Sequence, residues 1–177
     1  MVINVQIQGL KELQRKLKAV NDMMRSMKPY WKSVGEYVQR QTIKERFEKE
    51  QSPDGQKWKP HSEMTKKMRA KRHKTGDMRI LKDTGELRHV LAKPVAIEAG
   101  NSYVIFGTKL KYARIHQFGG IINVSKEQRG YLHHRGFHVG KTIKIPARPF
   151  LGITQQEREH IKSMLKSFIK RHITGGG

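Results

Sequence analysis

The stretch VAIEAGNSYVIF, residues 95–106, decides the fold class of this chain. Both of its ends are rich in β-branched and aromatic residues, which favour strands, and Gly100-Asn101 between them suits a tight turn. Pro94 stands directly before the stretch, at the entry of a strand, where a residue without an N–H group is tolerated. The stretch therefore predicts an antiparallel hairpin in the middle of the chain.

Two helical patterns precede this hairpin. From residue 10 to about residue 27, apolar residues recur at intervals of three and four, which predicts an amphipathic helix. We expect its apolar stripe to face the core, and a coiled-coil seam is the alternative. The stripe consists of Leu10, Leu13, Leu17, Val20 and Met24. Pro29 suits the first turn of a second helix that reaches about Glu50, and the alternation over residues 1–8 predicts a strand.

Short elements and one long helix follow the hairpin. Residues 112–118 predict two helical turns that a pair of glycines ends, and residues 121–124 and 142–145 predict paired strands. Thr154 and Glu157 have the spacing of a capping box, at the start of a last helix. The order of elements predicts one α+β domain over residues 1–177, with a small antiparallel sheet packed against amphipathic helices from both ends of the chain.

The composition excludes several kinds of site. The 177 residues include no cysteine, which excludes disulfides, thiolate metal sites and cysteine nucleophiles. Apolar runs are only a few residues long, and the first residues lack a basic region, so we expect neither a membrane segment nor a cleaved signal. Lys and Arg number 37 against 15 Asp and Glu, a net charge of +22. Such a charge attracts nucleic acid, anionic membranes or acidic proteins.

Residues 57–82 are the most basic part of the chain, and we expect a mobile insertion that orders when a partner binds, with a solvated loop or face that has no partner as the alternative. Ser62 can cap a short helix within it. The candidate contacts to an anionic partner are Lys66, Lys67, Arg69, Lys71, Arg72 and Lys74. Trp58 is interpreted as an anchor that holds this segment to the body, and stacking on a nucleic-acid base is the alternative.

Enzymatic and metal-binding functions find little support. A loop rich in histidine is expected at about residues 125–141, and His133, His134 and His138 lie close together in it. No carboxylate lies near them in the sequence, and Arg135 would repel a cation. Asp83, Glu86 and His89 suggest acid–base catalysis less readily than a helix cap at Thr84. We therefore expect no enzyme, no cofactor and no metal, with a metal-dependent nuclease as a distant alternative.

Four strings of sequence together resemble one protein family. They are SPDGQKW at residues 52–58, ILKDTGELR at residues 80–88, YARIHQFGG at residues 112–120 and IPARPFLG at residues 145–152. In this order they resemble the phage virion morphogenesis family, the tail-completion proteins of tailed bacteriophages. The resemblance implies a structural protein of the virion and no enzyme.

The family resemblance also implies a place and partners. It implies a protein that is assembled in the host bacterial cytoplasm, completes the tail and joins it to the DNA-filled head at the head–tail junction. It implies a homo-oligomeric ring, commonly sixfold, in contact with connector or neck proteins and with tail tube or sheath proteins. DNA in the channel is a further expected contact. The rival hypothesis is a basic, non-specific nucleic-acid-binding protein that acts as a monomer or dimer.

Two of the strings supply candidate residues for contacts between subunits. The candidates are Tyr112, His116, Gln117, Phe118, Arg148 and Phe150. The first four lie on a short segment ended by glycines, which presents an aromatic and polar cluster at a corner of the fold. Arg148 lies in a strip stiffened by prolines and can bind a carboxylate of the next subunit or a group of its own. Phe150 is expected to anchor this strip.

Overall fold

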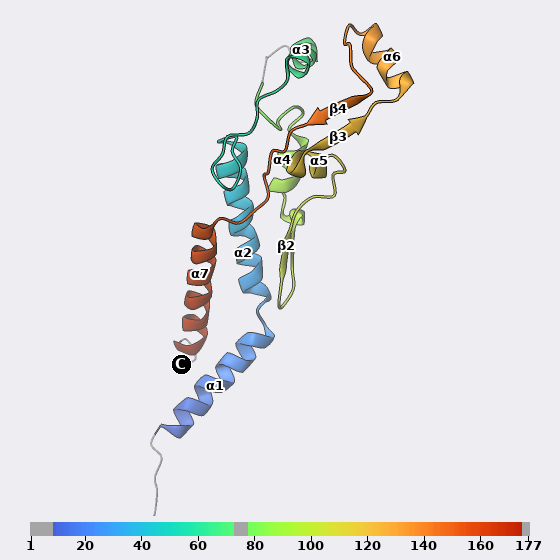
Figure 1. Ribbon diagram of the computed structural model, residues 1–177. Helices are drawn as coiled ribbons and strands as arrows, with labels where there is room; N and C mark the ends of the chain where they lie inside the picture. Colours follow the sequence, from blue (N-terminus) through green and yellow to red (C-terminus); the bar gives the residue numbers. More distant parts are fainter. Residues whose placement is uncertain (1–8, 73–77, 175–177) are drawn as a thin grey trace, which may run out of the picture.

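The computed structural model describes residues 9–72 and 78–174, which form a long, narrow molecule (Figure 1). The strand expected at residues 1–8 lies outside the described residues. The α-helices are α1 (Leu10–Arg25), α2 (Lys28–Gln41), α3 (Glu63–Arg72), α4 (Glu86–Ala92), α5 (Ala113–Phe118), α6 (Lys126–His134) and α7 (Gln155–Thr174). A π-helical segment, η1 (Thr42–Phe47), continues α2, and a 3₁₀ turn, η2 (Pro94–Ala96), precedes the first strand.

The strands form two separate antiparallel hairpins. Strand β1 (Ile97–Ala99) pairs with β2 (Val104–Phe106), with Ile97 opposite Phe106, as the central stretch predicts. Strand β3 (Gly120–Asn123) pairs with β4 (Thr142–Ile145), with Gly120 opposite Ile145. The α+β class is confirmed, although the expected small sheet consists of two hairpins that do not pair with each other.

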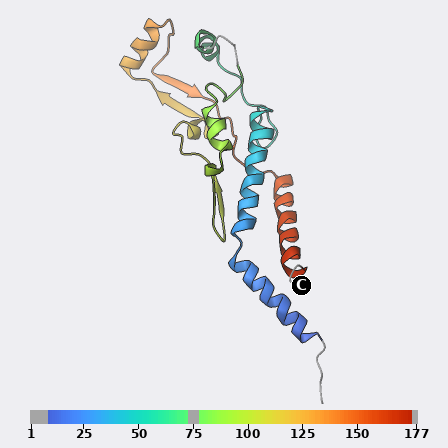
Figure 2. The ribbon, with the colours of Figure 1, turned by 180° about the vertical axis from the view of Figure 1, so that it is seen from behind.

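Helix α2 is the axis on which the lower half of the molecule is built. It lies between α7 on one side and the β1–β2 hairpin on the other (Figures 1 and 2). Gly35 makes the hairpin side possible, because a Cβ there would lie 2.5 Å from Ile97 Cγ2 and 2.8 Å from Val104 Cγ2. On the α7 side, Tyr30 and Val34 pack with Phe168 and with Met23 of α1 in a small core cluster. Residues far apart in the sequence therefore share this lower core.

A second core cluster lies in the upper half of the molecule. It gathers Phe47, Trp58, Ile80, Leu81, Leu87, Leu91, Ala113 and Phe150. All of these residues except Phe47 and Leu91 lie within the four strings singled out in the sequence. The second helix reaches this cluster through η1 and stops short of the expected end at Glu50, whose φ of 52° places it in the left-handed region.

The core-facing prediction for the α1 stripe is wrong for most of its residues. Leu10, Leu13, Leu17 and Met24 are between 46% and 65% exposed, whereas Val20 is partly buried against the lower core. The reason is visible in both ribbon views, in which α1 extends beyond the C-terminal end of α7 (Figures 1 and 2). Its first turns therefore have no helix of the same chain, among the described residues, to pack against.

The loop expected at residues 125–141 contains a helix. Ser125 and Gln128 form a capping box. The backbone N–H of Gln128 donates to Ser125 Oγ at 3.2 Å, and the backbone N–H of Ser125 donates to Gln128 Oε1 at 2.9 Å. Helix α6 follows from this signal, and the remaining residues return to β4. The arm formed by β3, α6 and β4 lies at the opposite end of the molecule from α1 (Figure 1).

A buried ion pair connects η1, which continues α2, to the start of α7. The Arg46 guanidinium lies 2.6 Å and 2.7 Å from the two carboxylate oxygens of Glu157, and both side chains are buried. Glu157 also closes the predicted capping box, because it accepts from the Thr154 amide at 2.8 Å. Burial acts to raise the pKa of the Glu157 carboxyl, but the hydrogen bonds and positive charge of Arg46, with the Thr154 amide, outweigh it and lower this pKa.

Replacing Glu157 with Gln tests how much this ion pair contributes to the stability of the protein. Gln keeps an oxygen for the capping box but leaves Arg46 buried without a counter-charge. We expect the free energy of unfolding to fall by about 3 kcal/mol, measured by urea denaturation. Glu159→Gln, an exposed acid on the same helix, is the matched control and should cost less than about 0.5 kcal/mol. Equal effects of the two changes would contradict the prediction.

Candidate functional site

The four strings meet around the residues 146–151, a strip without regular secondary structure between β4 and α7. Trp58 from the first string is buried against Phe47, with ring centroids 5.6 Å apart at 84°. Its indole N–H donates to the Pro149 carbonyl at 2.8 Å. The anchor interpretation of Trp58 is thus confirmed, and its burial excludes stacking on a base in this conformation.

Gln117 from the third string binds the same strip. Its side-chain oxygen accepts from the amides of Phe150 and Leu151 at 3.0 Å and 2.9 Å, and its side-chain nitrogen donates to the Leu151 carbonyl at 2.9 Å. A single side-chain amide thus serves two donors and one acceptor of the backbone, as a neighbouring strand would. Phe150 is 1% exposed, which places its ring in the core, as the sequence predicts for an anchor.

Arg148 is buried within its own chain. Its Nε donates to the Lys59 carbonyl at 2.8 Å and its Nη2 to the Pro60 carbonyl at 3.0 Å, while its backbone amide donates to the His116 carbonyl at 2.7 Å. Burial, followed by the nearby positive charge of Arg69, lowers the pKa of Arg148. Of the two alternatives for this side chain, the structure shows contacts within the subunit. A contact of Arg148 with another subunit stays a prediction.

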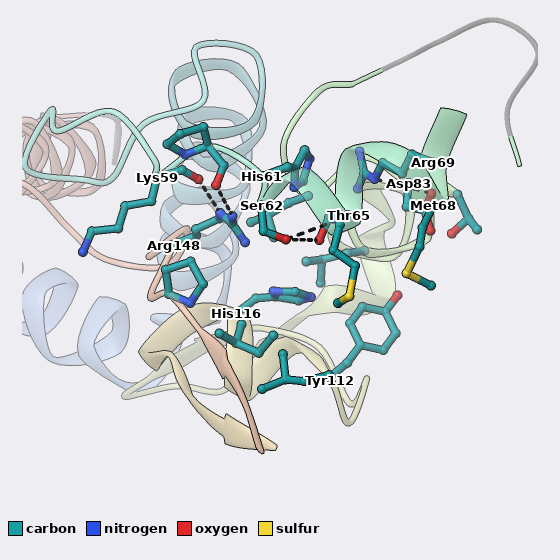
Figure 3. A pocket seen from close by; sticks show the side chains of 18 of the residues that line it. Lys59, His61, Ser62, Thr65, Met68, Arg69, Asp83, Tyr112, His116 and Arg148 are labelled. Atoms are coloured by element: carbon teal, nitrogen blue, oxygen red, sulfur yellow. Dashed lines mark hydrogen bonds and ion pairs between the residues drawn. The ribbon is translucent and has the colours of Figure 1, made fainter. Parts of the chain in front are cut away.

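The strings also enclose a pocket of about 710 Å³ beside this strip (Figure 3). Helix α3 lies on one side, where Thr65 and Met68 face across the pocket toward His116 and Tyr112. The wall of the pocket includes residues from every string after the first, and Lys59 from just beyond that first string. The pocket is therefore a product of the tertiary structure, assembled from segments spread over most of the chain.

Charged groups of both signs line this pocket. The buried Arg69 donates to the Arg79 carbonyl at 2.7 Å and lies 3.7 Å from Asp83 Oδ1. The Tyr112 hydroxyl donates to Glu86 Oε2 at 2.9 Å. Burial, together with this hydrogen bond, raises the pKa of Tyr112 to about 12, so the phenol stays protonated at neutral pH.

Two histidines in the pocket have ring nitrogens that are buried without a hydrogen-bond partner. They are Nε2 of His61 and Nδ1 of His116. Burial lowers the pKa of both imidazoles, and the positive charges of Arg69 and Arg148 lower these pKa values further. Both rings are therefore neutral at neutral pH, and their unpartnered nitrogens are available to a polar group that enters the pocket.

The hydroxyls of Ser62 and Thr65, which also line the pocket, have partners within α3 and its cap. Ser62 Oγ accepts from the Thr65 amide at 3.2 Å and lies 2.9 Å from Thr65 Oγ1, so Ser62 caps α3 as predicted. Asp83 and Glu86 reach the pocket, whereas His89 is not among the residues that line it. Over residues 9–72 and 78–174 no three His, Asp or Glu side chains are grouped as metal ligands would be. Ser62 and Thr65 therefore serve the start of α3.

Of the six candidate contact residues, His116 lines the pocket, and the other five fall into two groups. Tyr112 and Phe118 are exposed, and Phe118 is the more exposed at 73%. Gln117 and Arg148 instead hold the strip together from inside, as does the ring of Phe150. The sequence did not single out His61 or Met68, since neither belongs to a string and only the tertiary structure brings them to the pocket.

The candidate contacts for an anionic partner lie on or just after α3. Lys66, Lys67 and Lys71 are exposed, and the Lys71 ammonium lies 4.9 Å from the centre of the Phe137 ring. Arg69 is buried and bound within the chain, so it is not available to a partner in this conformation. The side chain of Arg72 and the whole of Lys74 lie outside the described residues.

The expected mobility of the basic insertion stays a prediction. At its two ends, Trp58, Ile80 and Leu81 belong to the upper core. The segment is therefore joined to the body on both sides of α3, and more of it is buried than its polar composition indicated.

Comparison with known sequences assigns the chain to a class of bacteriophage assembly proteins. It belongs to the phage virion morphogenesis family, whose sequence model matches residues 8–170. The resemblance inferred from the four strings is thereby confirmed. No solved structure matches the chain significantly.

Three curated relatives are similar to this chain. G protein 1 of the Mu-like prophage FluMu of Haemophilus influenzae is 29% identical over 153 residues, which cover 86% of each chain. Tail completion protein S of Escherichia phage P2 is 28% identical over 132 residues, 75% of this chain and 77% of that protein. G protein 2 of FluMu is 34% identical over 80 residues, 45% of this chain and 47% of that protein. Family and relatives support a role in phage tail assembly.

The described helices include none long and apolar enough to cross a membrane.

The pocket histidines predict a pH dependence of stability. Their pKa values are lower in the folded state, so below about pH 6.5 the unfolded chain binds protons that the folded chain does not. The free energy of unfolding should therefore fall as the pH falls from 7 through the folded pKa values. Urea denaturation between pH 7 and pH 5 measures this fall.

Two single substitutions test whether the pocket histidines, rather than the other histidines, cause this pH dependence. His116→Gln should flatten the pH dependence, because it removes one titrating ring from the pocket. His89→Gln, at an exposed position outside the pocket, should leave the dependence as in the parent protein. A pH profile unchanged by His116→Gln would show that the histidine is not responsible.

Proposed function

We propose that this chain completes the tail of a bacteriophage and joins it to the DNA-filled head, as one subunit of a ring in the neck of the virion. The observation that carries the proposal is the match of the family over residues 8–170, with a relative named tail completion protein S. This function requires surfaces for other proteins rather than a reaction centre, and no enzymatic family is indicated by the comparisons.

Exposed apolar side chains of the arm, and of α5 directly before it, support a role in assembly. Phe118 of α5, Ile121 of β3 and Tyr131 of α6 are all exposed. Apolar side chains that lie together on a surface are typical of protein–protein contacts, and Tyr131 lies with Ile122 and Ile143 beside one groove. The strip held by Gln117 and Trp58 follows directly after β4 of the arm. Many such contacts around a ring would add their binding free energies.

The proposal is tested by deleting the gene from the virus or prophage that encodes this chain. We expect lysates to contain DNA-filled heads and separate tails, counted by electron microscopy, and a loss of infectious particles. Supply of the parent gene from a plasmid should restore joined particles. Normal infectious particles from the deletion would contradict the proposal.

Replacing Phe118 with Ser separates a contact role from a folding role. Because the ring is 73% exposed, the free energy of unfolding should change by less than about 0.5 kcal/mol. The yield of joined particles should nevertheless fall at least about tenfold, since 1.4 kcal/mol of lost contact energy already corresponds to that factor. Complementation of the deletion, with unfolding measured on the purified variant, checks both expectations.

Two controls accompany this variant. Arg114→Ala changes an exposed residue of the same helix and should preserve particle yield. Phe150→Ala should lower the free energy of unfolding by about 3–5 kcal/mol, because it empties a buried site, and any loss of particles from it reports misfolding. Full particle yield from Phe118→Ser would show that this ring makes no essential contact.

A basic nucleic-acid-binding protein remains the second candidate, on the strength of the net charge of +22. The exposed Lys66, Lys67 and Lys71 of α3 are its candidate phosphate contacts. This function predicts binding to duplex DNA that weakens steeply with salt, together with no affinity for tails or connectors. A filter-binding titration at several salt concentrations, compared with sedimentation on purified tails, distinguishes the two functions.

A further inference from the structure

Helix α1 presents an apolar stripe that the described part of the chain does not cover. The six residues Leu10, Leu13, Leu17, Val20, Met24 and Met27 follow the alternating three- and four-residue spacing of a heptad repeat. Val20 and Met27 pack on the lower core, whereas the three leucines and Met24 are exposed. Leu10, Leu13 and Leu17 thus stand at i, i+3 and i+7 on a helix end that extends beyond the body (Figure 1).

An open apolar groove lies at the other end of the molecule. It has a volume of about 530 Å³ and lies between α6 and the β3–β4 hairpin. Ile122, Ile143, Tyr131 and Leu132 contribute most of its lining, and Ile122 and Tyr131 are exposed to solvent. Glu127 supplies the charge among the described residues that line it. The groove has the form and the apolar lining of a binding site for an amphipathic helix.

We propose that the groove of one subunit binds the α1 helix of the next copy of the same chain. Leucines spaced at i, i+3 and i+7 are the usual anchors of a helix in an apolar groove. The one charged side chain among the described residues that line the groove, Glu127, is opposite in sign to the net charge of α1, which carries five Lys or Arg against two Asp or Glu. This proposal rests on the proposed ring and names the contact between its neighbouring subunits.

The positions of the two surfaces suit a head-to-tail contact. Because α1 and the arm lie at opposite ends of the molecule, one subunit can give its helix to one neighbour and receive a helix from another (Figures 1 and 2). Such a head-to-tail contact repeats until it closes into a ring or continues as a filament. Pairing of two α1 helices would instead end at a dimer, bring two basic helices together and leave both grooves empty.

The absence of cysteine from the chain permits a direct test. Leu13→Cys and Ile122→Cys place single thiols at exposed positions of the stripe and of the groove. After mixing and mild oxidation, we expect a disulfide-linked dimer from the pair of variants and at least tenfold less from either variant alone. Lys18→Cys, on another face of α1, is the matched control and should give little crosslink with Ile122→Cys.

The crosslinking is carried out on the concentrated purified protein and on particles assembled with both variants. Dimers from Leu13→Cys alone would overturn the proposal in favour of paired α1 helices. Absence of the mixed crosslink from both preparations would also overturn it. If joined particles form without the mixed crosslink, the proposed function stands and this contact fails. If the crosslink forms while the gene deletion still yields normal particles, the contact stands and the proposed function fails.

A charged residue introduced into the apolar stripe of α1 allows a second test, in which self-association is measured. Leu17→Glu changes an exposed side chain, so the unfolding midpoint should stay within error of the parent protein. Self-association measured by analytical ultracentrifugation should weaken at least tenfold, while Lys18→Glu, on another face of α1, should not weaken it. Equal association of Leu17→Glu and the parent protein would contradict the proposed contact.

Discussion

The strip at residues 146–151 has to satisfy its backbone polar groups without a helix or a strand of its own, and most of the upper molecule depends on how it does so. A buried backbone group without a partner costs as much as a lost hydrogen bond. Side chains supply the partners here, since Gln117 serves Phe150 and Leu151 and the Trp58 indole serves Pro149. Residues from distant strings are therefore bound to one extended segment.

The same strip also connects the two halves of the molecule. The strip continues from β4 of the arm and leads into α7, where Glu157 forms its buried pair with Arg46. The arm, the pocket and the lower core are thus connected through a short covalent path whose ends are both fixed. Arg148 adds the loop after Trp58 to the same connection through the Lys59 and Pro60 carbonyls. Replacing any of these side chains should consequently lower the stability of the subunit itself, and any effect on contacts with other subunits should follow from that loss.

Sequence signals predicted the elements correctly where an element depends on interactions between residues that are close together in the sequence. The hairpin at residues 95–106, the cap at Ser62 and the capping box of α7 each depend on neighbouring residues, and each is confirmed. Helix α6 was missed because its histidines suggested a loop, although Ser125 and Gln128 already carried the capping signal.

Local sequence signals could not predict the features that depend on tertiary structure. Periodicity establishes that α1 is amphipathic, but it contains no information on whether a covering element belongs to the same chain. The pocket likewise combines His61 and His116, which are 55 residues apart in the sequence, and no local pattern connects them. The strings themselves marked the segments that meet, while the geometry showed that Gln117 and Arg148 act inside the subunit.

The charge of the chain sets a condition on any assembly of its copies. Subunits that each carry +22 repel one another, and this repulsion weakens as salt screens it over about 10 Å. Exposed apolar side chains on α1 and the arm favour contact, and their contribution changes little with moderate salt. In the proposed ring these two effects oppose each other. An acidic neighbour in the virion would reduce the repulsion without altering the apolar contacts, so assembly on such a neighbour would be favoured over assembly in free solution.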